Sequence, residues 1–463
     1  MLIEFNISNY LSIKRKISLD MRAASISEHK DSNLIFLPKF ELLKSAAIYG
    51  ANASGKTNLI KGIRFMKSFV MNSSTSYQVN DKIDVTPFRL NVENEYKPSF
   101  FEVVFYLNMK KYRYGFEVSK NEVFSEWLYE AKVTSEKMLF KRKRNNIEIN
   151  KRNFKEGAGF EDKTRNNALF LSVCAQFNGN LSISILNWFS KLNAIHGIQD
   201  ELYEGFTINM MKDNLKDKII EFVKKADMNI LDINVEELDL KAENITDKIP
   251  LEIRLQIEKD LGPKSKLNKL HTIHNIYNED NEVINKMSFN LNDAESEGTK
   301  KFFRFAGPII DTLINGKILV VDEFDAKMHP LLTKSIVKLF NSSETNQNNA
   351  QLIFATHDTN LLSSNIFRRD QIWFTEKDHG ESTDLYSLVE FKISEKSNKF
   401  TEKDLGESLD NSSLNELKLP DKLIKVRKDA SFENDYLRGR YGAIPFIFGL
   451  NNIIESNGEK SED

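Results

Sequence analysis

The chain is poor in cysteine, since its 463 residues include only Cys174. A single thiol can form neither an intramolecular disulfide nor a metal cage of cysteine thiolates. This composition fits a reducing compartment, and we expect a cytoplasmic protein. An apolar run of the roughly 18 residues needed to cross a bilayer is also missing, and the first residues, MLIEFNISNY, do not resemble a signal peptide. We therefore expect no membrane partner.

A strong excess of charge is missing too. Lysine and arginine number 65 and aspartate and glutamate 67, which gives a net charge of −2. This balance excludes a uniformly basic coat for nucleic acid but leaves local patches open. Hydrophobic residues make up 40% of a chain that is too long for one ordinary domain. We therefore expect two or three packed units with sizeable cores.

The stretch GANASGKTN, residues 50–58, has the spacing G-x-x-x-x-G-K-[ST] of a phosphate-binding loop. The apolar segment SAAIYG precedes it, and a segment with helical spacing, residues 56–72, follows it. Glycines in the loop let several backbone N–H groups point at one phosphate. Lys56 is expected to reach the β- and γ-phosphates, and Thr57 to ligate Mg²⁺. The expected nucleotide-binding residues of the loop are Gly50, Asn52, Ala53, Ser54, Gly55, Lys56, Thr57 and Asn58.

Two further apolar segments end in residue types that nucleotide hydrolysis requires. ILVV, residues 318–321, leads into Asp322 and Glu323, and LIFAT leads into His357. Asp322 is expected to hold Mg²⁺ and Glu323 to polarise the attacking water. His357 is expected to contact the γ-phosphate or to fix that water. The alternatives are two solvent-facing acids and a structural histidine.

A second candidate phosphate site is SEGT, residues 296–299, at the predicted start of a helix. A helix N-terminus with serine and glycine binds anions. In one architecture such a helix start closes over the γ-phosphate that a neighbouring subunit holds. Ser296, Gly298 and Thr299 would then be nucleotide-binding residues. The alternative is an ordinary helix cap formed by Ser296.

In this order, the four elements resemble the ABC-type ATPases of the SMC, RecF and OLD group, over residues 1–70 and 285–365. The resemblance implies ATP and Mg²⁺ as cofactors and makes SEGT the signature motif. It also implies a glutamine that joins the core to an inserted lobe and touches Mg²⁺ or the water. Gln176 is the candidate for this catalytic and metal-ligating glutamine. The motifs themselves do not separate ATP from GTP.

The predicted fold class is α/β, with a P-loop NTPase core of ABC type, an antiparallel β lobe and a short, mainly helical insertion. Residues 1–175 are expected to form the first half of the core with the β lobe, and residues 176–285 the insertion. Residues 286–380 would complete the core, and residues 381–463 would form a docking region with a polar tail. Within the insertion, a helix is predicted over residues 182–198, and LEIRLQIEKD is predicted as a strand.

A narrower resemblance rests on SGKTNLIKGIRFMKSFV, PFRLN, SEWLYE, DEFDAKMHP and VRKDASFENDYLRGRYGAIPF. These stretches look like the short ABC ATPases of bacterial defence operons, including the RloA, AbiL and PARIS-type ATPase subunits. The resemblance implies a sensor or regulatory ATPase that forms a homodimer or higher oligomer with ATP at the interface. It also implies an effector from the same operon, often a Toprim-type nuclease, that stops phage growth by harming the infected cell. No D-x-D pair follows His357, so we expect no nuclease in this chain.

Two other functions stay open. A DNA-repair ATPase of the RecF type would bind DNA directly, and the run FKRKRNN, with Lys141 to Arg144, is its candidate contact. A solvated turn is the other interpretation of this run. A nucleotide-gated scaffold with negligible turnover would keep the same core.

Two remaining features favour structural roles or leave the choice open. His271 and His274 fall on opposite faces of a predicted strand, so they are not expected to share a metal. The loop from Arg438 to Gly442 is interpreted either as a docking loop or as packing of the tail onto the core.

Overall fold

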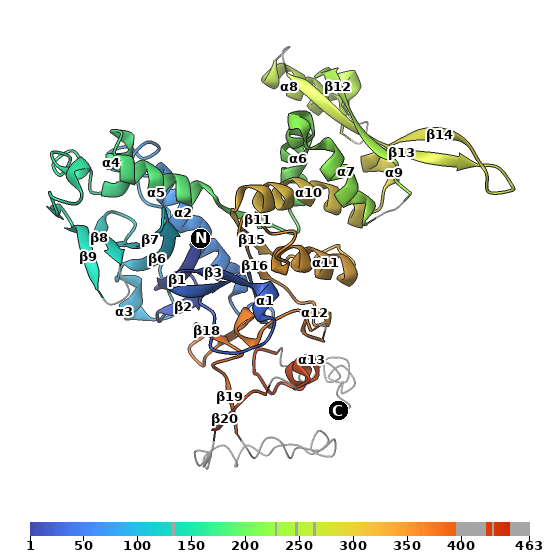
Figure 1. The fold of residues 1–463 in the computed structure, drawn as a ribbon. Helices are drawn as coiled ribbons and strands as arrows, with labels where there is room; N and C mark the ends of the chain where they lie inside the picture. The colour runs from blue at the N-terminus through green and yellow to red at the C-terminus, as the bar shows by residue number, and fades with distance from the viewer. Residues whose placement is uncertain are drawn as a thin grey trace, which may run out of the picture. The chain divides into compact units, whose positions relative to one another are not determined.

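The computed structural model describes residues 1–131, 135–226, 229–245, 249–262, 265–363, 365–394, 423–427 and 430–444. The chain divides into two compact units, and each is built from separate stretches of sequence. Unit 1 comprises Met1–Ile195, Gly316–Phe324 and Val337–Asp463, and unit 2 comprises His196–Asn315 and Asp325–Ile336. Figure 1 shows the elements in chain order from blue to red.

The centre of unit 1 is a six-stranded sheet in the order β11-β15-β16-β5-β17-β18. The four middle strands are parallel, and β18 is antiparallel to β17. Strands β15, β16 and β5 are buried along their whole length, as expected for parallel strands that are covered on both faces. Their bounds are Leu192–His196 (β11), Ile318–Asp322 (β15), Gln351–Ala355 (β16), Ser45–Gly50 (β5), Ile372–Lys377 (β17) and Thr383–Ser387 (β18).

A second, antiparallel sheet of seven strands has the order β10-β9-β8-β7-β6-β1-β2. It is the predicted β lobe extended by the first two strands of the chain. Helix α2 (Lys56–Asn72) shares one hydrophobic core with both sheets, and its Leu59, Ile63, Met66 and Val70 are buried as the helical spacing predicts. The strand bounds are Leu2–Ser8 (β1), Ile17–Asp20 (β2), Ser99–Leu107 (β6), Lys110–Val118 (β7), Val123–Ala131 (β8), Glu136–Lys143 (β9) and Asn146–Ile149 (β10).

Side chains alternate between the two faces of this antiparallel sheet. Phe101, Tyr114 and Leu128 are fully buried in the shared core, whereas Arg113 and Trp127 on the opposite face are partly exposed. We call this opposite face the outer face. The remaining elements of unit 1 are α1 (Lys30–Asn33), β3 (Leu34–Leu37), β4 (Phe40–Leu43), α3 (Val92–Glu95), α4 (Phe170–Gln176), α5 (Asn180–Ser190), α12 (Asn360–Ser363), β19 (Lys392–Ser394), β20 (Leu423–Lys425) and α13 (Phe432–Leu437).

Unit 2 has its own core around α10 (Glu297–Asn315), which packs with α6 and α7. A three-stranded antiparallel sheet, β12-β13-β14, belongs to the same unit, and β13 and β14 form its long hairpin (Figure 1). The bounds are Glu204–Met210 (α6), Lys216–Lys224 (α7), Asp232–Asp239 (β12), Leu251–Leu261 (α8), Lys266–Tyr277 (β13), Val283–Asn290 (β14) and Leu291–Ala294 (α9). Helix α11 spans Pro330–Asn341.

Two secondary-structure predictions are wrong. The predicted helix over residues 182–198 ends at Ser190, and β11 follows because the Ile318 amide donates to the carbonyl of Lys191 at the sheet edge. The segment LEIRLQIEKD forms α8 and not a strand. Pro250 precedes this helix and Gly262 ends it. Such helix boundary signals prevail here over the alternating apolar pattern.

The segment of residues 430–444 packs onto the core of unit 1. Tyr441 is fully buried, and its carbonyl accepts a 2.6 Å hydrogen bond from the hydroxyl of Tyr386. The ring of Tyr436 lies 5.9 Å from that of Tyr49 on β5, and burial raises the pKa of Tyr436 to about 12. These contacts favour packing of the Arg438–Gly442 loop over a free docking loop. The predicted polar tail beyond Asn452 lies outside the described residues.

A candidate nucleotide site at the edge of the parallel sheet

The glycine loop joins the end of β5 to the start of α2. Gly55 has φ 111°, and a Cβ there would meet the Thr383 hydroxyl oxygen at 2.1 Å. A Cβ at Gly50 would lie 2.4 Å from the hydroxyl oxygen of Thr375. The loop therefore approaches the neighbouring strands β17 and β18 at a distance that only glycine allows.

Lys56 is the first residue of α2, and its side chain reaches back over the loop. Its Nζ donates to the carbonyl oxygens of Gly50 at 2.7 Å and Ala51 at 3.1 Å. The side chain is only 7% exposed. The ammonium is thus held at the centre of the loop, where a phosphate bound by the loop amides would meet it.

Hydroxyl and amide groups from other strands fix the loop from outside. The Ser54 hydroxyl lies 2.6 Å from that of Thr375, and Thr383 donates to the Ser54 carbonyl at 2.9 Å. Ser12, between β1 and β2, links Thr383 at 2.7 Å to the side-chain amide of Asn58 at 2.7 Å. Sequence reasoning did not find Ser12, Thr375 or Thr383, because single hydroxyl residues in distant segments carry no recognisable spacing.

Asp322 and Glu323 stand at the carboxyl end of β15. Asp322 is 3% exposed, and its carboxylate accepts from the backbone amide of Glu323 at 3.1 Å. Glu323 has φ 49°, in the left-handed region, so the chain turns sharply at this residue. The amide of Phe324 then donates to the carbonyl of Ala355 at the end of β16. The two acids are therefore fixed at the same edge of the sheet as the glycine loop.

His357 follows β16, which lies between β15 and β5 in the sheet. The Thr356 amide donates to the Ile48 carbonyl, and the Tyr49 hydroxyl donates to the Asp358 carbonyl at 3.3 Å. His357 itself is exposed. Because the carboxyl ends of parallel strands meet at one edge, unit 1 brings the glycine loop, the two acids and this histidine together.

The loop that follows His357 also contacts the C-terminal segment. The Thr359 hydroxyl donates to the carboxylate of Glu433 on α13 at 3.2 Å. Helix α13 therefore touches two parts of the site, since its Tyr436 packs on Tyr49 at the base of the glycine loop.

In unit 2, Ser296 caps helix α10. Its hydroxyl accepts from the Thr299 amide at 3.1 Å and lies 2.9 Å from the Thr299 hydroxyl. Ser296 is exposed, whereas Thr299 is 5% exposed. A Cβ at Gly298 would come no closer than 3.4 Å to the carbonyl of Lys327, an ordinary contact. Ser296 therefore caps the helix and is also exposed to solvent at its start, so the cap does not exclude a phosphate contact at this position.

Buried charges hold α10 within unit 2. Lys301 is fully buried and its Nζ donates to the carbonyl of Ala326. Arg304 pairs with Asp200 at 2.9 Å and Glu204 at 3.0 Å. At the exposed start of the helix, Lys300 lowers the pKa of the Glu297 carboxyl through a 3.0 Å ion pair. The first turn of α10 is thus tied to the segment that follows the acidic strand.

The structure does not bring Gln176 to the glycine loop. Helix α4 docks at the far end of α2, where the Ser172 hydroxyl donates to the Val70 carbonyl at 2.6 Å. Val70 lies about 21 Å along α2 from Lys56, because an α-helix rises about 1.5 Å per residue. Gln176 is exposed and only one helical turn beyond Ser172. We therefore do not retain it as a catalytic or metal-ligating residue.

The basic run from Lys141 to Arg144 does not act as one cluster. Arg142 is 1% exposed, pairs with Glu126 at 3.7 Å and donates to the carbonyls of Ala168 and Arg165. The strand alternation puts Lys141 and Lys143 on the outer face instead. Arg144 lies over the ring of Phe124.

The two histidines of β13 also separate as predicted. His271 contacts Glu236 at 2.9 Å, and His274 contacts Glu295 at 2.9 Å. Within the described ranges, no group of three or more His, Cys, Asp or Glu side chains is placed to hold a metal. The described helices also include none that is long and apolar enough to cross a membrane.

The residues at the sheet edge fit a nucleoside triphosphate with Mg²⁺. The loop packs closely against Thr375 and Thr383, as only glycine at positions 50 and 55 allows, and backbone amides with one lysine suit phosphate oxygens. The hydroxyl of Thr57 and the carboxylate of Asp322 are the hard oxygen donors that Mg²⁺ takes from proteins.

A model of a known protein family matches most of the segments that form this candidate site. The family described as "AAA domain, putative AbiEii toxin, Type IV TA system" matches residues 45–363, from the start of β5 to beyond His357. The chain belongs to this AAA family. This membership and the parallel sheet with its glycine loop agree with the predicted α/β P-loop fold class and with a nucleotide as the ligand. The search of curated proteins found no match to this chain.

The solved structures that match this chain include SMC head domains and RecF, all at low similarity. The SMC head domain from Thermotoga maritima is 12% identical, with a TM-score of 0.39, over 83% of this chain and 98% of that chain. An SMC head bound to the C-winged helix domain of ScpA has a TM-score of 0.43 at 12% identity, over 83% and 97%. The recombination mediator protein RecF with ATP has a TM-score of 0.29 at 14% identity, over 77% and 93%. Scores this low assign no residue role or partner to the AAA protein.

Proposed function

We propose that this AAA protein binds and hydrolyses ATP and uses the nucleotide to control its own dimerisation. The observation that carries the proposal is the gathering of the glycine loop, Asp322, Glu323 and His357 at one edge of the parallel sheet. Phosphoryl transfer depends mainly on positioning and charge stabilisation, and this edge offers groups for both.

Each residue has a proposed task. The loop amides and Lys56 bind the β- and γ-phosphates, and their positive charge stabilises the negative charge that develops during transfer. Thr57 and Asp322 would hold Mg²⁺, which neutralises phosphate charge when it is bound. Glu323 orients and polarises the attacking water, and His357 contacts the γ-phosphate or that water.

Dimerisation is proposed from the second helix start. Ser296 and Gly298 of one copy would close over the γ-phosphate held by Lys56 of another copy, with ATP at the interface. Ser296 is exposed at the N-terminus of a 19-residue helix, where amides and helix dipole favour an anion. Because hydrolysis removes only the γ-phosphate, contacts from both copies to this group would make ATP favour the closed dimer.

The biological role is proposed to be bacterial defence against phage. The family description names a toxin and a toxin–antitoxin system, and the narrower sequence resemblance points to defence-operon ATPases such as RloA, AbiL and the PARIS-type subunits. In this proposal the chain is the sensor or regulatory subunit, and a separately encoded effector, of which a Toprim-type nuclease is favoured, does the damage.

The ATPase proposal is tested with the Glu323→Gln variant. We expect ATP binding to persist and turnover to fall by at least about 100-fold, as for the loss of a catalytic base. Light scattering after size exclusion should then show a dimer with ATP and a monomer with ADP. Glu344→Gln, which changes an exposed acid of unit 1, is the matched control. Normal turnover by Glu323→Gln would remove this residue from its role.

The defence proposal needs a separate experiment. The tagged chain is purified from cells that carry its native operon, and co-eluting proteins are identified by mass spectrometry. A stoichiometric nuclease-like partner is the expected result. Recovery of the chain alone, or with DNA and replication proteins, would contradict the effector assignment.

A further inference from the structure

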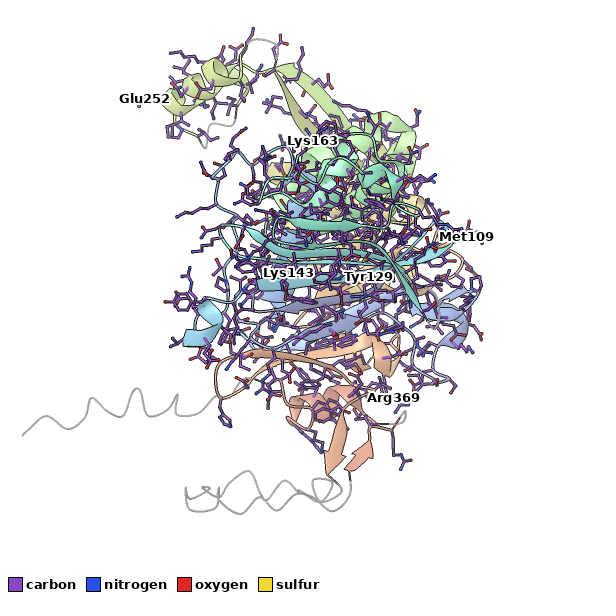
Figure 2. The ribbon with its side chains drawn as sticks, turned by 90° about the vertical axis from the view of Figure 1, so that its left-hand side faces the viewer. Met109, Tyr129, Lys143, Lys163, Glu252 and Arg369 are labelled. Atoms are coloured by element: carbon purple, nitrogen blue, oxygen red, sulfur yellow. The ribbon has the colours of Figure 1, made fainter. Side chains whose placement is uncertain are left out.

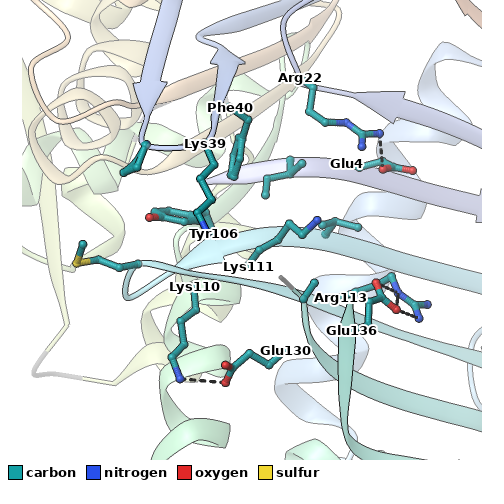
Figure 3. Close-up of a pocket in the computed structure, with 15 residues that line it drawn as sticks. Glu4, Arg22, Lys39, Phe40, Tyr106, Lys110, Lys111, Arg113, Glu130 and Glu136 are labelled. Carbon is teal, nitrogen blue, oxygen red and sulfur yellow. Dashed lines mark hydrogen bonds and ion pairs between the residues drawn. The ribbon is translucent and has the colours of Figure 1, made fainter. Parts of the chain in front are cut away.

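Two hollows lie along the outer face of the seven-stranded sheet, and another adjoins the larger of them at the β3–β4 hairpin. The largest, of about 870 Å³, lies between the β3–β4 hairpin and strands β1, β6 and β7 (Figure 3). It shares Arg22, Lys39 and Phe40 with a hollow of about 490 Å³ at the hairpin. It shares Arg113 with a third hollow, of about 470 Å³, over β8 and β9. Together they form one surface, which we call the outer groove.

The outer groove is long enough for a polymer. It crosses β1, β6, β7, β8 and β9 in their order in the sheet. Neighbouring strands lie about 4.8 Å apart, so these five strands span about 19 Å before the hairpin is added. Figure 2 looks onto this face, on which Met109, Tyr129 and Lys143 are labelled.

Most acids in the groove are paired with a lysine or an arginine. Glu4 pairs with Arg22 at 2.8 Å, and Glu130 pairs with Lys110 at 2.9 Å. Glu102, which is 5% exposed, and Glu136 both pair with Arg113, at 2.7 Å and 2.6 Å, and Glu102 also pairs with Lys16 at 3.6 Å. Figure 3 shows three of these pairs in the largest hollow, Glu4 with Arg22, Glu130 with Lys110 and Glu136 with Arg113. Little uncompensated negative charge therefore remains on the walls.

Four lysines in the groove form no ion pair with an acid among the described residues. Lys39 and Lys111 line the largest hollow, and Lys141 and Lys143 line the third. In the described part of the chain none of the four has an ion pair with a carboxylate. Glu117 is the single acid that lines the third hollow, against five lysine and arginine residues, of which Arg142 is buried. The groove thus carries a net positive charge at both ends.

Aromatic rings stand between these lysines. The Trp127 ring covers Gly115, where a Cβ would meet it at 2.5 Å, and it stacks on Phe100 at a centroid distance of 5.5 Å. The Trp127 indole N–H donates to Glu102 at 2.9 Å, which fixes the ring against the sheet. Phe40 meets Tyr106 edge to face at 5.8 Å in the largest hollow. At the hairpin, Phe36 is 56% exposed.

We propose that the outer groove binds single-stranded nucleic acid. Lysine ammonium groups at intervals suit a phosphate backbone, and rings fixed on a sheet surface suit unstacked bases. A mononucleotide would use one hollow only, whereas the shared residues join all three. A duplex would hide its bases from the rings. This site is separate from the nucleotide site, and the proposal does not rest on the ATPase function.

The test uses the full-length protein and a fluorescent oligothymidylate of about 15 nucleotides, near the upper site size for one binding fold. Fluorescence anisotropy gives the affinity at several salt concentrations. The double variant Lys141→Glu/Lys143→Glu should bind at least tenfold more weakly, while its ATP turnover stays unchanged. Its log–log salt slope should fall in magnitude by about 1.4, since each phosphate contact on a single strand contributes about 0.7.

A matched control makes the same charge change elsewhere. Lys151→Glu/Lys155→Glu reverses two exposed lysines on a segment whose Phe154 packs against Phe140 in the core, on the other face of the sheet. This control should bind the oligonucleotide like the wild type. Equal loss in both double variants would show non-specific attraction and overturn the site.

A second variant tests the rings without changing charge. Phe36→Ala removes an exposed ring, so folding should be preserved, and affinity should fall by about tenfold if a base stacks there. Tighter binding of a duplex of the same length, or wild-type binding no stronger than that of thymidine monophosphate, would overturn the proposal.

Discussion

The ammonium of Lys56 donates to the carbonyl oxygen of Gly50 over 2.7 Å, so the first residue of α2 is tied to the last residue of β5. The glycine loop is closed by its own lysine. The charge that would bind phosphate is therefore already placed at the centre of the loop.

Replacing this lysine should weaken nucleotide binding strongly. Charge-assisted hydrogen bonds contribute about 1.5–3 kcal/mol each, so Lys56→Ala should weaken the binding of a fluorescent ATP analogue by at least tenfold. Lys61→Ala, at an exposed position of the same helix, is the control and should bind normally. If both variants bind alike, Lys56 does not hold the phosphates.

Ser296 offers a way to separate a cap from a phosphate contact. Aspartate caps a helix about as well as serine, so Ser296→Asp should keep the melting temperature. Its carboxylate would repel the γ-phosphate of the other copy, so turnover and ATP-dependent dimerisation should fall at least about tenfold. Ser296→Ala should instead cost about 1 kcal/mol of stability. Normal turnover by Ser296→Asp would reduce this residue to a helix cap.

Arg142 should contribute strongly to stability, in contrast to the lysines on either side of it. Its removal leaves the buried carboxylate of Glu126 without its ion pair, and loss of one partner of a buried pair costs about 3–5 kcal/mol. Arg142→Met should show this loss in urea unfolding, whereas Lys143→Met should stay within about 0.5 kcal/mol of the wild type. Equal stabilities would contradict the buried role.

The same variant should show a pH dependence. Burial raises the pKa of Glu126, and Arg142 opposes this rise, so the folded-state pKa should rise further in Arg142→Met. The stability from a group with a raised folded pKa is complete below the unfolded pKa and is lost as the pH rises through the folded pKa. The deficit of the variant should therefore be smaller at about pH 5 than at about pH 8. A deficit that is constant with pH would show that Glu126 does not titrate.

Cys174 should be inert in the folded protein. Burial, and next the charge of Glu126, raise the pKa of its thiol well above the ordinary value, and only the thiolate reacts. A thiol reagent at neutral pH should label no residue in the native chain and one residue after unfolding. Lys61→Cys, which adds an exposed thiol, should be labelled once in the native state. Rapid labelling of the native wild-type protein would contradict the buried position.

Local patterns were enough to predict which segments meet at the edge of the parallel sheet. The glycine loop is contiguous, and Asp322, Glu323 and His357 each follow an apolar strand, so the parallel sheet gathers them without further information. Ser12, Thr375 and Thr383 could not be predicted, because only the packing of the β1–β2 connection, β17 and β18 brings these hydroxyls to the loop. Gln176 was chosen by resemblance, but tertiary packing carries α4 to the wrong end of α2.

The central claim is that each nucleotide is served by two copies, and a mixing experiment tests it most directly. Lys56→Ala and Ser296→Arg should each be inactive alone, because one lacks the phosphate lysine and the other blocks closure. In a mixed dimer, the intact Ser296 of the first variant meets the intact Lys56 of the second, so one complete site forms. Random mixing should restore about one quarter of the wild-type ATP turnover, since half of the dimers are mixed and each has one of two sites. If the mixture stays as inactive as the separate variants and forms no ATP-dependent dimer, the shared site is wrong.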